Sequence, residues 1–257
     1  SDTVLNAEGS IFMKLLYIEC NMGAAGDMLL SALYELLKDQ KEFLLHMNSL
    51  DLGGVHFRAA AGGRANIAGS HVEVADGERP QERAHVHDHV TPGSIAALID
   101  RLNLPQDVCA HAQAVYAAIA QAEAKAHKCP VEEVHFHEVG APDAVAEIVG
   151  VCYAMYLLAP ERVVVSPVCV GTGTVCCAPG VLPVPTPATA NLLVGVPTYA
   201  GDVQGELCTP TGAALLTHFA DAFGPMPAMT GCSVGIGLGG KQLSETDCVR
   251  AFLGEMQ

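Results

Sequence analysis

At 257 residues, the chain is long enough for one large domain or two small ones with a sizeable hydrophobic core. Its formal net charge is −15 at pH 7, and so acidic a surface repels phosphate backbones, which argues against nucleic-acid binding. No apolar run approaches the roughly 18–20 residues of a membrane span, so the composition indicates a soluble, cytoplasmic protein without a membrane segment.

The N-terminus and the cysteines indicate the same compartment. Residues 1–12 are interpreted as a tag or upstream extension, because Met13 suits a natural start and no basic-then-apolar signal pattern is present. The ten cysteines are scattered through apolar segments and include no C-x-x-C pair. In a chain of this size without a signal peptide, we expect reduced thiols that pack as small hydrophobes.

Residues 13–75 are expected to form an N-terminal α/β segment. Residues 15–19 are typical of a buried strand, and a glycine-containing loop follows over residues 20–27. The next helix has an apolar stripe that consists of Leu29, Leu30, Leu33, Leu36 and Leu37. Two β-type runs, at 55–60 and 67–74, predict a pair of strands.

Residues 76–91 are polar and lack periodicity, which predicts a linker to a main α/β segment at 92–257. The linker holds His85, His87 and His89, which share one face if the backbone is extended. Short His-rich tracts bind Ni²⁺ or Zn²⁺, and in a flexible segment such binding suits delivery better than catalysis. A solvated loop explains the tract nearly as well, so both interpretations stay open.

Helices dominate the first half of the main segment. The expected helices cover residues 92–102, 105–125 and 143–158. A strand is expected at 163–165, β-type runs at 168–170 and 174–176, short helices at 188–193 and 212–220, and strand-like residues over 233–253. Interleaved strands and helices predict an α/β or α+β fold around a mixed sheet.

The densest group of ionisable side chains spans residues 135–147, where two imidazoles and three carboxylates occupy thirteen positions. If residues 135–137 are extended, His135 and His137 point to one face and Phe136 to the other. Asp143 and Glu147 lie one turn apart on the helix that follows. Such groups at a strand–helix junction suit a borderline divalent metal. A buried histidine pair, an Asp that favours the helix dipole and a solvated Glu form the alternative.

Two further segments lie at predicted helix starts. Gly23, Gly26 and Asp27 follow the first strand, where exposed amides favour an anion and Asp27 could ligate a metal that bridges to it. A glycine turn with Asp27 as the N-cap is the simpler interpretation. Thr209, Thr211 and Gly212 could hold a phosphate through amides and hydroxyls, although helix capping by Thr209 alone accounts for that sequence.

Two other patterns have weaker support. The adjacent pair Cys176-Cys177 could supply a soft metal ligand, with inert thiols as the default. Gly235-x-Gly237-x-x-Gly240 fits a dinucleotide fingerprint, and Gly235 to Lys241 fits most of a P-loop. Only 17 residues follow Gly240 and Gln242 replaces the hydroxyl residue that would touch Mg²⁺, so a nucleotide site is disfavoured.

With these segments in view, the chain resembles the LarC family, the nickel-insertion proteins of nickel-pincer cofactor biosynthesis. The matching blocks are LYIECNMGAAGDM (16–28), VHFHEVGAPDAVAEIVG (134–150), LPVPTPAT (182–189), GELCTPTGAALL (205–216) and CVRAFLG (248–254). They occur in order over nearly everything after Met13, and the HFHEVG block together with LPVPTPAT is specific.

The resemblance implies a CTP-dependent nickel chelatase, or cyclometallase, of the lyase class. Such a protein inserts Ni²⁺ into pyridinium-3,5-bisthiocarboxylic acid mononucleotide through two Ni–S bonds and one Ni–C bond, which gives the cofactor of lactate racemase. The implied metal ligands are His135, His137, Glu138 and Asp143, with the three linker histidines as further candidates. The implied catalytic residues are Glu138, Asp27 and Glu147, because metallation of a ring carbon needs a base. The implied residues for the substrate phosphate are Gly23, Gly26, Thr209, Thr211 and Gly212.

The chain departs from the family pattern at several places. Cys177-Ala178-Pro179-Gly180 stands where family members often read CAHG, and Cys169 stands where others have a His. The family also has a C-terminal part, expected to bind CTP with Mg²⁺ or Mn²⁺, that this chain lacks and would need as a partner. Whether the chain turns over alone and whether it forms a homo-oligomer stay open. The alternative functions are a non-enzymatic nickel-binding and delivery module and a zinc-dependent hydrolase.

Overall fold

The computed structural model describes residues 12–64, 67–76, 90–177, 180–241 and 245–256. The predicted tag at 1–12 (apart from residue 12) and the linker histidines His85, His87 and His89 lie outside these ranges, so those interpretations stay predictions.

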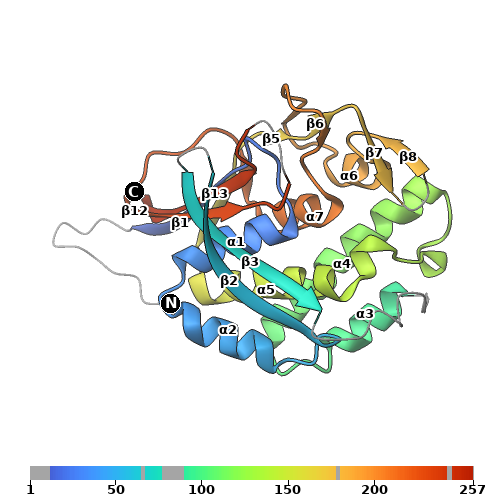
Figure 1. The fold of residues 1–257 in the computed structure, drawn as a ribbon, viewed down its shortest axis with the longest axis horizontal. Helices are drawn as coiled ribbons and strands as arrows, with labels where there is room; N and C mark the ends of the chain where they lie inside the picture. Colours follow the sequence, from blue (N-terminus) through green and yellow to red (C-terminus); the bar gives the residue numbers. More distant parts are fainter. Residues whose placement is uncertain (1–11, 65–66, 77–89, 178–179, 242–244, 257) are drawn as a thin grey trace.

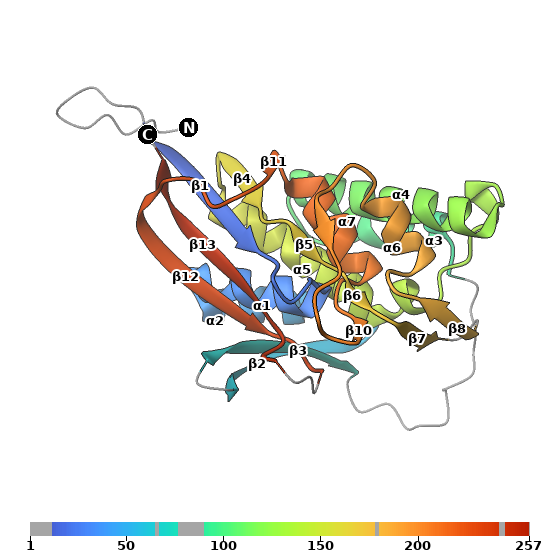
Figure 2. The same cartoon turned by 90° about the horizontal axis from the view of Figure 1, so that it is seen from above.

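One seven-stranded mixed sheet organises the fold, as the α/β prediction requires (Figures 1 and 2). Its strand order is β11-β4-β1-β13-β12-β3-β2. The strands are β1 (Met13–Glu19), β2 (Val55–Arg64), β3 (Ile67–Asp76), β4 (Arg162–Val165), β11 (Ala222–Phe223), β12 (Thr230–Leu238) and β13 (Cys248–Met256). The pairs β1–β4, β4–β11 and β12–β3 are parallel, whereas β1–β13, β12–β13 and β2–β3 are antiparallel.

The helices gather on one side of this sheet, as the view from above shows (Figure 2). They are α1 (Gly26–Leu36), α2 (Gln40–Ser49), α3 (Pro92–Ile99), α4 (Gln106–His127), α5 (Pro142–Leu158), α6 (Pro187–Leu192) and α7 (Pro210–Phe219), with 3₁₀ turns η2 (Val131–Glu133) and η3 (Glu138–Gly140). The chain between α5 and α7 forms three small two-stranded sheets. They are β5 (Val168–Cys169) with β9 (Thr198–Tyr199), β6 (Gly171–Thr172) with β10 (Gly205–Glu206), and β7 (Thr174–Cys177) with β8 (Gly180–Pro183).

Most of the expected elements are confirmed, with shifted ends. The helices predicted at 105–125 and 143–158 are α4 and α5, and the strand pair predicted at 55–60 and 67–74 is the longer hairpin β2–β3. Helix α2 has no counterpart in the prediction, because it buries only Phe43 and Met47 and its remaining residues give too thin an apolar stripe.

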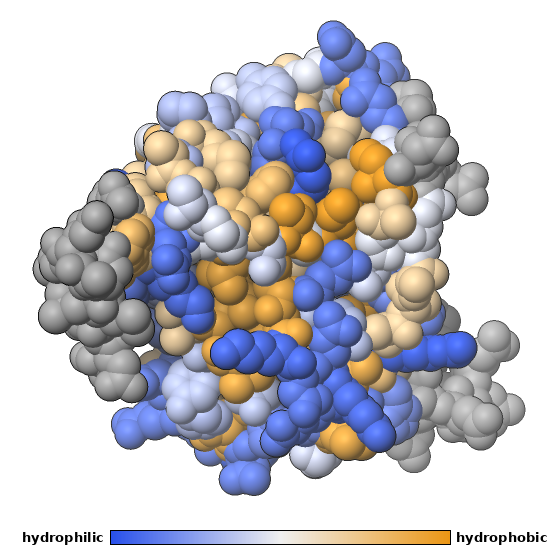
Figure 3. Space-filling model, turned by 90° about the vertical axis from the view of Figure 1, so that its left-hand side faces the viewer, coloured by the Kyte–Doolittle hydropathy of each residue, from blue (hydrophilic) through white to orange (hydrophobic). Residues whose placement is uncertain are grey.

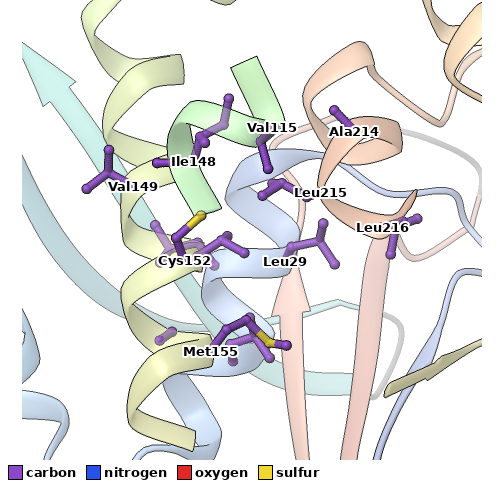
Figure 4. Packing of buried hydrophobic residues seen from close by; sticks show 14 of the residues in the cluster. Leu29, Val115, Ile148, Val149, Cys152, Met155, Ala214, Leu215 and Leu216 are labelled. Atoms are coloured by element: carbon purple, nitrogen blue, oxygen red, sulfur yellow. The ribbon is translucent and has the colours of Figure 1, made fainter. Parts of the chain in front are cut away.

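The main core lies between the helices and the sheet. Helix α5 is apolar on almost every side, since it packs on α1, α4 and α7 at once, and Figure 4 shows Ile148, Cys152 and Met155 facing Leu29 and Leu215. All ten cysteines are free thiols, as the sequence predicted. No helix in the described ranges is long and apolar enough to cross a membrane.

The opposite face of the sheet carries a second, smaller hydrophobic cluster. Alternation along β1 sends Leu16 and Ile18 to the helices and Leu15 and Tyr17 to this other face, where Val164 joins them. Figure 3, which faces the side of the molecule that holds β1, β12 and β13, shows a broad hydrophobic area bordered by hydrophilic residues.

Glycines in β12 allow helix α1 to lie against the sheet. A Cβ atom at Gly235 would lie 2.0 Å from the carbonyl oxygen of Ala32, and one at Gly237 would lie 1.9 Å from that of Met28. Two of the three glycines in the fingerprint-like pattern therefore belong to a strand that a helix covers, rather than to a loop between a strand and a helix.

We predict that Gly237→Ala destabilises the fold by at least about 3 kcal/mol, because α1 must move away from β12. Urea unfolding followed by circular dichroism would measure this loss. Gly240→Ala is the matched control, since a Cβ there meets no atom within 4 Å. Equal stability of the two variants would contradict the proposed packing constraint.

Candidate functional site

The backbone around the two central histidines is fixed from behind. The N–H of Phe136 donates to the carbonyl oxygen of Val90 at 2.8 Å, and the buried Phe136 ring lies 5.7 Å from that of Tyr116, centroid to centroid. His135 and His137 alternate with buried Val134 and Phe136 and are themselves exposed. The prediction that the two imidazoles share one face is thereby confirmed.

This face borders a cavity of about 360 Å³. Its walls combine apolar side chains from α4, α6 and β7–β8 with imidazoles, carboxylates, thiols and a hydroxyl. The polar lining residues are Glu123, His127, His135, His137, Glu138, Cys176, Cys177, Thr186 and Glu206.

Two lining carboxylates are partly buried. Burial raises the pKa of Glu206, and the nearby Glu138 adds to this, while Lys241 and a hydrogen bond from Thr186 oppose it. The Thr186 Oγ1 donates to Glu206 Oε1 at 3.1 Å. Burial also raises the pKa of Glu123, opposed by His127 and His137, and its Oε2 lies 3.5 Å from His127 Nε2. These contacts hold both carboxylates against the cavity.

The Cys177 thiol belongs to the same electrostatic environment. Desolvation raises its pKa, and the carboxylates of Glu138 and Glu206 raise it further. The Sγ lies 3.4 Å from the carbonyl oxygen of Gly180. A divalent cation in the cavity would oppose both carboxylates and favour the thiolate.

A second group of carboxylates joins the starts of α1 and α5. Burial raises the pKa of Glu147 to about 8, and the charges of Asp27 and Asp143 add to this, while the backbone N–H of Asp27 donates to Glu147 and opposes it. Burial also raises the pKa of Asp27, whose carboxylate accepts from the Met28 N–H at 2.8 Å. The sequence prediction that Asp143 and Glu147 share a face agrees with this coupling.

Lys241 links the two groups. Its Nζ donates to the carbonyl oxygen of Glu206, and its charge opposes the rise that burial causes in the pKa of both Glu206 and Asp27. The carboxylate pair Asp27–Glu147 and the cavity are therefore neighbouring parts of one polar region.

The structure brings together three of the four predicted metal ligands. His135, His137 and Glu138 line the cavity, whereas Asp143 lies with Glu147 and is not among the lining residues. Within the described ranges, no three or more His, Cys, Asp or Glu side chains are grouped closely enough to hold a metal ion as they stand. The ligand set therefore stays a prediction.

The residues predicted to bind phosphate serve close packing in this structure. A Cβ at Gly23 would lie 2.1 Å from the Leu207 carbonyl oxygen, one at Gly26 2.4 Å from Glu147 Oε2, and one at Gly212 2.1 Å from the Ala24 carbonyl oxygen. Their role in binding phosphate stays a prediction.

The two capping interpretations have different outcomes. Thr209 caps α7, as its Oγ1 accepts from the Gly212 N–H at 3.2 Å and lies 2.9 Å from Thr211 Oγ1. The alternative that Asp27 is the N-cap of α1 is wrong, because the helix begins at Gly26 with Ala25 as its N-cap.

Four polar lining residues were missed by sequence reasoning: Glu123, His127, Thr186 and Glu206. Glu123 and His127 are four residues apart at the end of α4, a spacing that places them on one face. Thr186 lies inside the LPVPTPAT block and Glu206 inside the GELCTPTGAALL block, which held only predicted phosphate ligands.

An α/β protein with imidazoles, carboxylates and thiols around one cavity has the ligand chemistry of proteins that handle divalent transition metals. The sequence profile of the family described as "Nickel insertion protein" matches residues 16–257, and the chain belongs to this family.

Curated relatives support this assignment. The pyridinium-3,5-bisthiocarboxylic acid mononucleotide nickel insertion protein of Desulfitobacterium hafniense (strain DSM 10664 / DCB-2) is 41% identical over 95% of this chain and 59% of its own length. The proteins of the same name from Nocardioides sp. and Staphylococcus saprophyticus are 40% and 37% identical, over 94% and 92% of this chain and 60% and 59% of their own. The chain thus spans about 60% of the length of these relatives. No solved structure matches it.

We predict that Glu147 makes the stability of the chain fall as the pH rises from about 5 to 8. The unfolded chain loses the Glu147 proton near the ordinary value of 4.5, whereas the native chain keeps it up to a pKa of about 8, so the native state binds more protons in between. Glu147→Gln should therefore gain stability over the wild type across this window, by up to about 4 kcal/mol.

Urea unfolding at pH 5, 6, 7 and 8 would measure this difference. Glu133→Gln, at an exposed position of η2, is the control and should show a pH-independent difference. A pH-independent difference for Glu147→Gln as well would contradict the raised pKa.

Proposed function

We propose that the chain binds Ni²⁺ and inserts it into pyridinium-3,5-bisthiocarboxylic acid mononucleotide, the compound in the names of its relatives. The observation that carries this proposal is the cavity that gathers His135, His137 and Glu138 with Cys177 and Glu206, in a chain of the nickel insertion family. The cavity volume of about 360 Å³ falls within the range of small-molecule sites, about 300–1,000 Å³.

The kinds of ligand suit a protein that must release its metal. Imidazole and carboxylate groups bind Ni²⁺, yet they surrender it more easily than a closed cage of thiolates would. The proposed ligands are His135, His137 and Glu138, with Asp143 as the remaining predicted ligand and His85, His87 and His89 as candidates for delivery. Nickel then passes to the two sulfur atoms of the mononucleotide, because sulfur is the softer ligand.

Formation of a Ni–C bond requires that the ring carbon lose its proton while the electron pair of the C–H bond passes to nickel. A base works best when its pKa lies near the working pH. Glu138 meets the condition of position, because it lines the cavity. Glu147, with a pKa of about 8 and coupled to Asp27, meets the condition of proton affinity. We assign the three carboxylates to proton removal and storage.

We assign the remaining steps to the part of the relatives' length that this chain does not span. We place CTP, with Mg²⁺ or Mn²⁺, in that C-terminal part, and we propose that the two parts act together as a cytoplasmic nickel chelatase of the lyase class. Gly23, Gly26, Thr209, Thr211 and Gly212 remain our candidates for the phosphate of the mononucleotide. The product would be the cofactor of lactate racemase.

We predict that the double variant His135→Ala/His137→Ala binds Ni²⁺ at least about ten times more weakly, because two imidazole ligands are lost. Calorimetric titration of the purified chain with Ni²⁺ would measure this. His56→Ala, at an exposed histidine of β2, is the control and should bind like the wild type. Unchanged nickel affinity in the double variant would overturn the assignment of these ligands.

We also predict that nickel transfer to the mononucleotide requires CTP and the part of the relatives that this chain does not span. Mass spectrometry of the mononucleotide after incubation with the nickel-loaded chain would detect the product. Transfer in the absence of CTP would contradict the proposed reaction, and tightly bound zinc with ester hydrolysis would favour a hydrolase instead.

A further inference from the structure

The lining of the cavity is acidic, which favours cations over anions. Glu123, Glu138 and Glu206 line the cavity, none of the described lining residues is Lys or Arg, and Lys241, which is not among the lining residues, offsets part of the charge of Glu206 alone. Thr186 and His127 hold Glu206 and Glu123 in place, so neither carboxylate turns away without losing a contact. The whole chain adds to this field with a net charge of −15.

The mononucleotide in the relatives' names is itself an anion. Two thiocarboxylic acid groups and one phosphate outweigh the single positive charge of the pyridinium ring at neutral pH. Placed in the metal-free cavity, its thiocarboxylates would lie beside carboxylates without an opposing charge from the lining residues described above. A divalent cation held by His135, His137 and Glu138 would reverse this relation, because it both offsets the carboxylates and binds sulfur.

We propose that the cavity takes its two substrates in a fixed order, the divalent metal first and the anionic mononucleotide second. This inference rests on the proposed function and adds the order in which the two substrates bind. The metal-free cavity excludes the mononucleotide, and the bound metal is the group that recruits it. Glu123 and Glu206 enforce the order by their charge, a role separate from metal ligation and from proton removal.

The test uses a probe that binds nickel weakly in free solution, pyridinium-3,5-dicarboxylic acid mononucleotide, in which oxygen replaces both sulfur atoms. Without CTP, the affinity of the chain for this probe is measured by calorimetry with and without saturating Ni²⁺. We expect binding at least about ten times tighter with Ni²⁺. By linkage the probe must tighten nickel binding equally, so stopped-flow mixing in both orders then shows which species forms the complex.

The double variant Glu123→Gln/Glu206→Gln isolates the charge effect. It should bind the probe at least about five times more tightly than the wild type in the absence of metal, and Glu133→Gln, on the exposed turn η2, should not. If the double variant fails to fold, 0.5 M NaCl serves the same purpose in the wild type, because salt screens the repulsion and should strengthen metal-free binding.

The possible results separate the two proposals. Equal probe affinity with and without Ni²⁺, together with nickel binding that depends on His135 and His137, overturns the fixed order and leaves the proposed function standing. Nickel binding that is indifferent to both histidines overturns the proposed function and this inference with it.

Discussion

The close approach of helix α1 to its neighbours is the constraint on which the rest of the structure depends. Gly235 and Gly237 let α1 lie on β12, and Gly26 lets its first turn lie against Glu147 of α5. The α1 backbone therefore lies directly on β12, and its first turn lies on the Glu147 side chain, so the start of α1 is fixed relative to the sheet and to α5 at once. The same close contact brings the carboxylates of Asp27 and Glu147 together and buries them, which is the physical reason for the raised pKa of both.

The histidine segment depends on an equivalent anchor. Phe136 is fixed by a hydrogen bond to Val90 and by the ring of Tyr116, and burial of Val134 and Phe136 leaves His135 and His137 at the cavity. The Tyr116 hydroxyl in turn donates to the carbonyl oxygen of Val139 at 2.9 Å, which fixes the turn η3 and with it Glu138. A residue behind the cavity thus determines which side chains line it.

The local pattern was sufficient where one segment decides its own geometry. Alternation at residues 134–137 and the four-residue spacing of Asp143 and Glu147 predicted which side chains share a face, and the apolar stripes predicted α1, α4 and α5. Distant pairings were beyond such patterns. No local signal tells that Asp27 meets Glu147, that the fingerprint-like glycines serve helix packing, or that Glu206 and Glu123 face the same cavity as His135. Helix α2 was not predicted, because its two buried residues give only a weak hydrophobic periodicity.

The two polar groups have complementary tasks in nickel insertion as we propose it. The cavity groups hold the metal through oxygen and nitrogen ligands. Transfer of the metal to sulfur is favourable, because sulfur is the softer ligand. That transfer does not by itself remove the ring proton, which needs an acceptor that is unprotonated beforehand and stable once protonated. A pKa of about 8 leaves Glu147 protonated at neutral pH in the metal-free chain, so the buried pair Asp27–Glu147 becomes such an acceptor only once a nearby dication lowers that pKa. Lys241, coupled to Asp27 and bonded to the backbone of Glu206, connects the charge of this pair with that of the cavity. A dication bound beside Glu206 would therefore lower the pKa of the carboxyl pair. Metal binding would favour the ionised form of this acceptor before the ring proton is released.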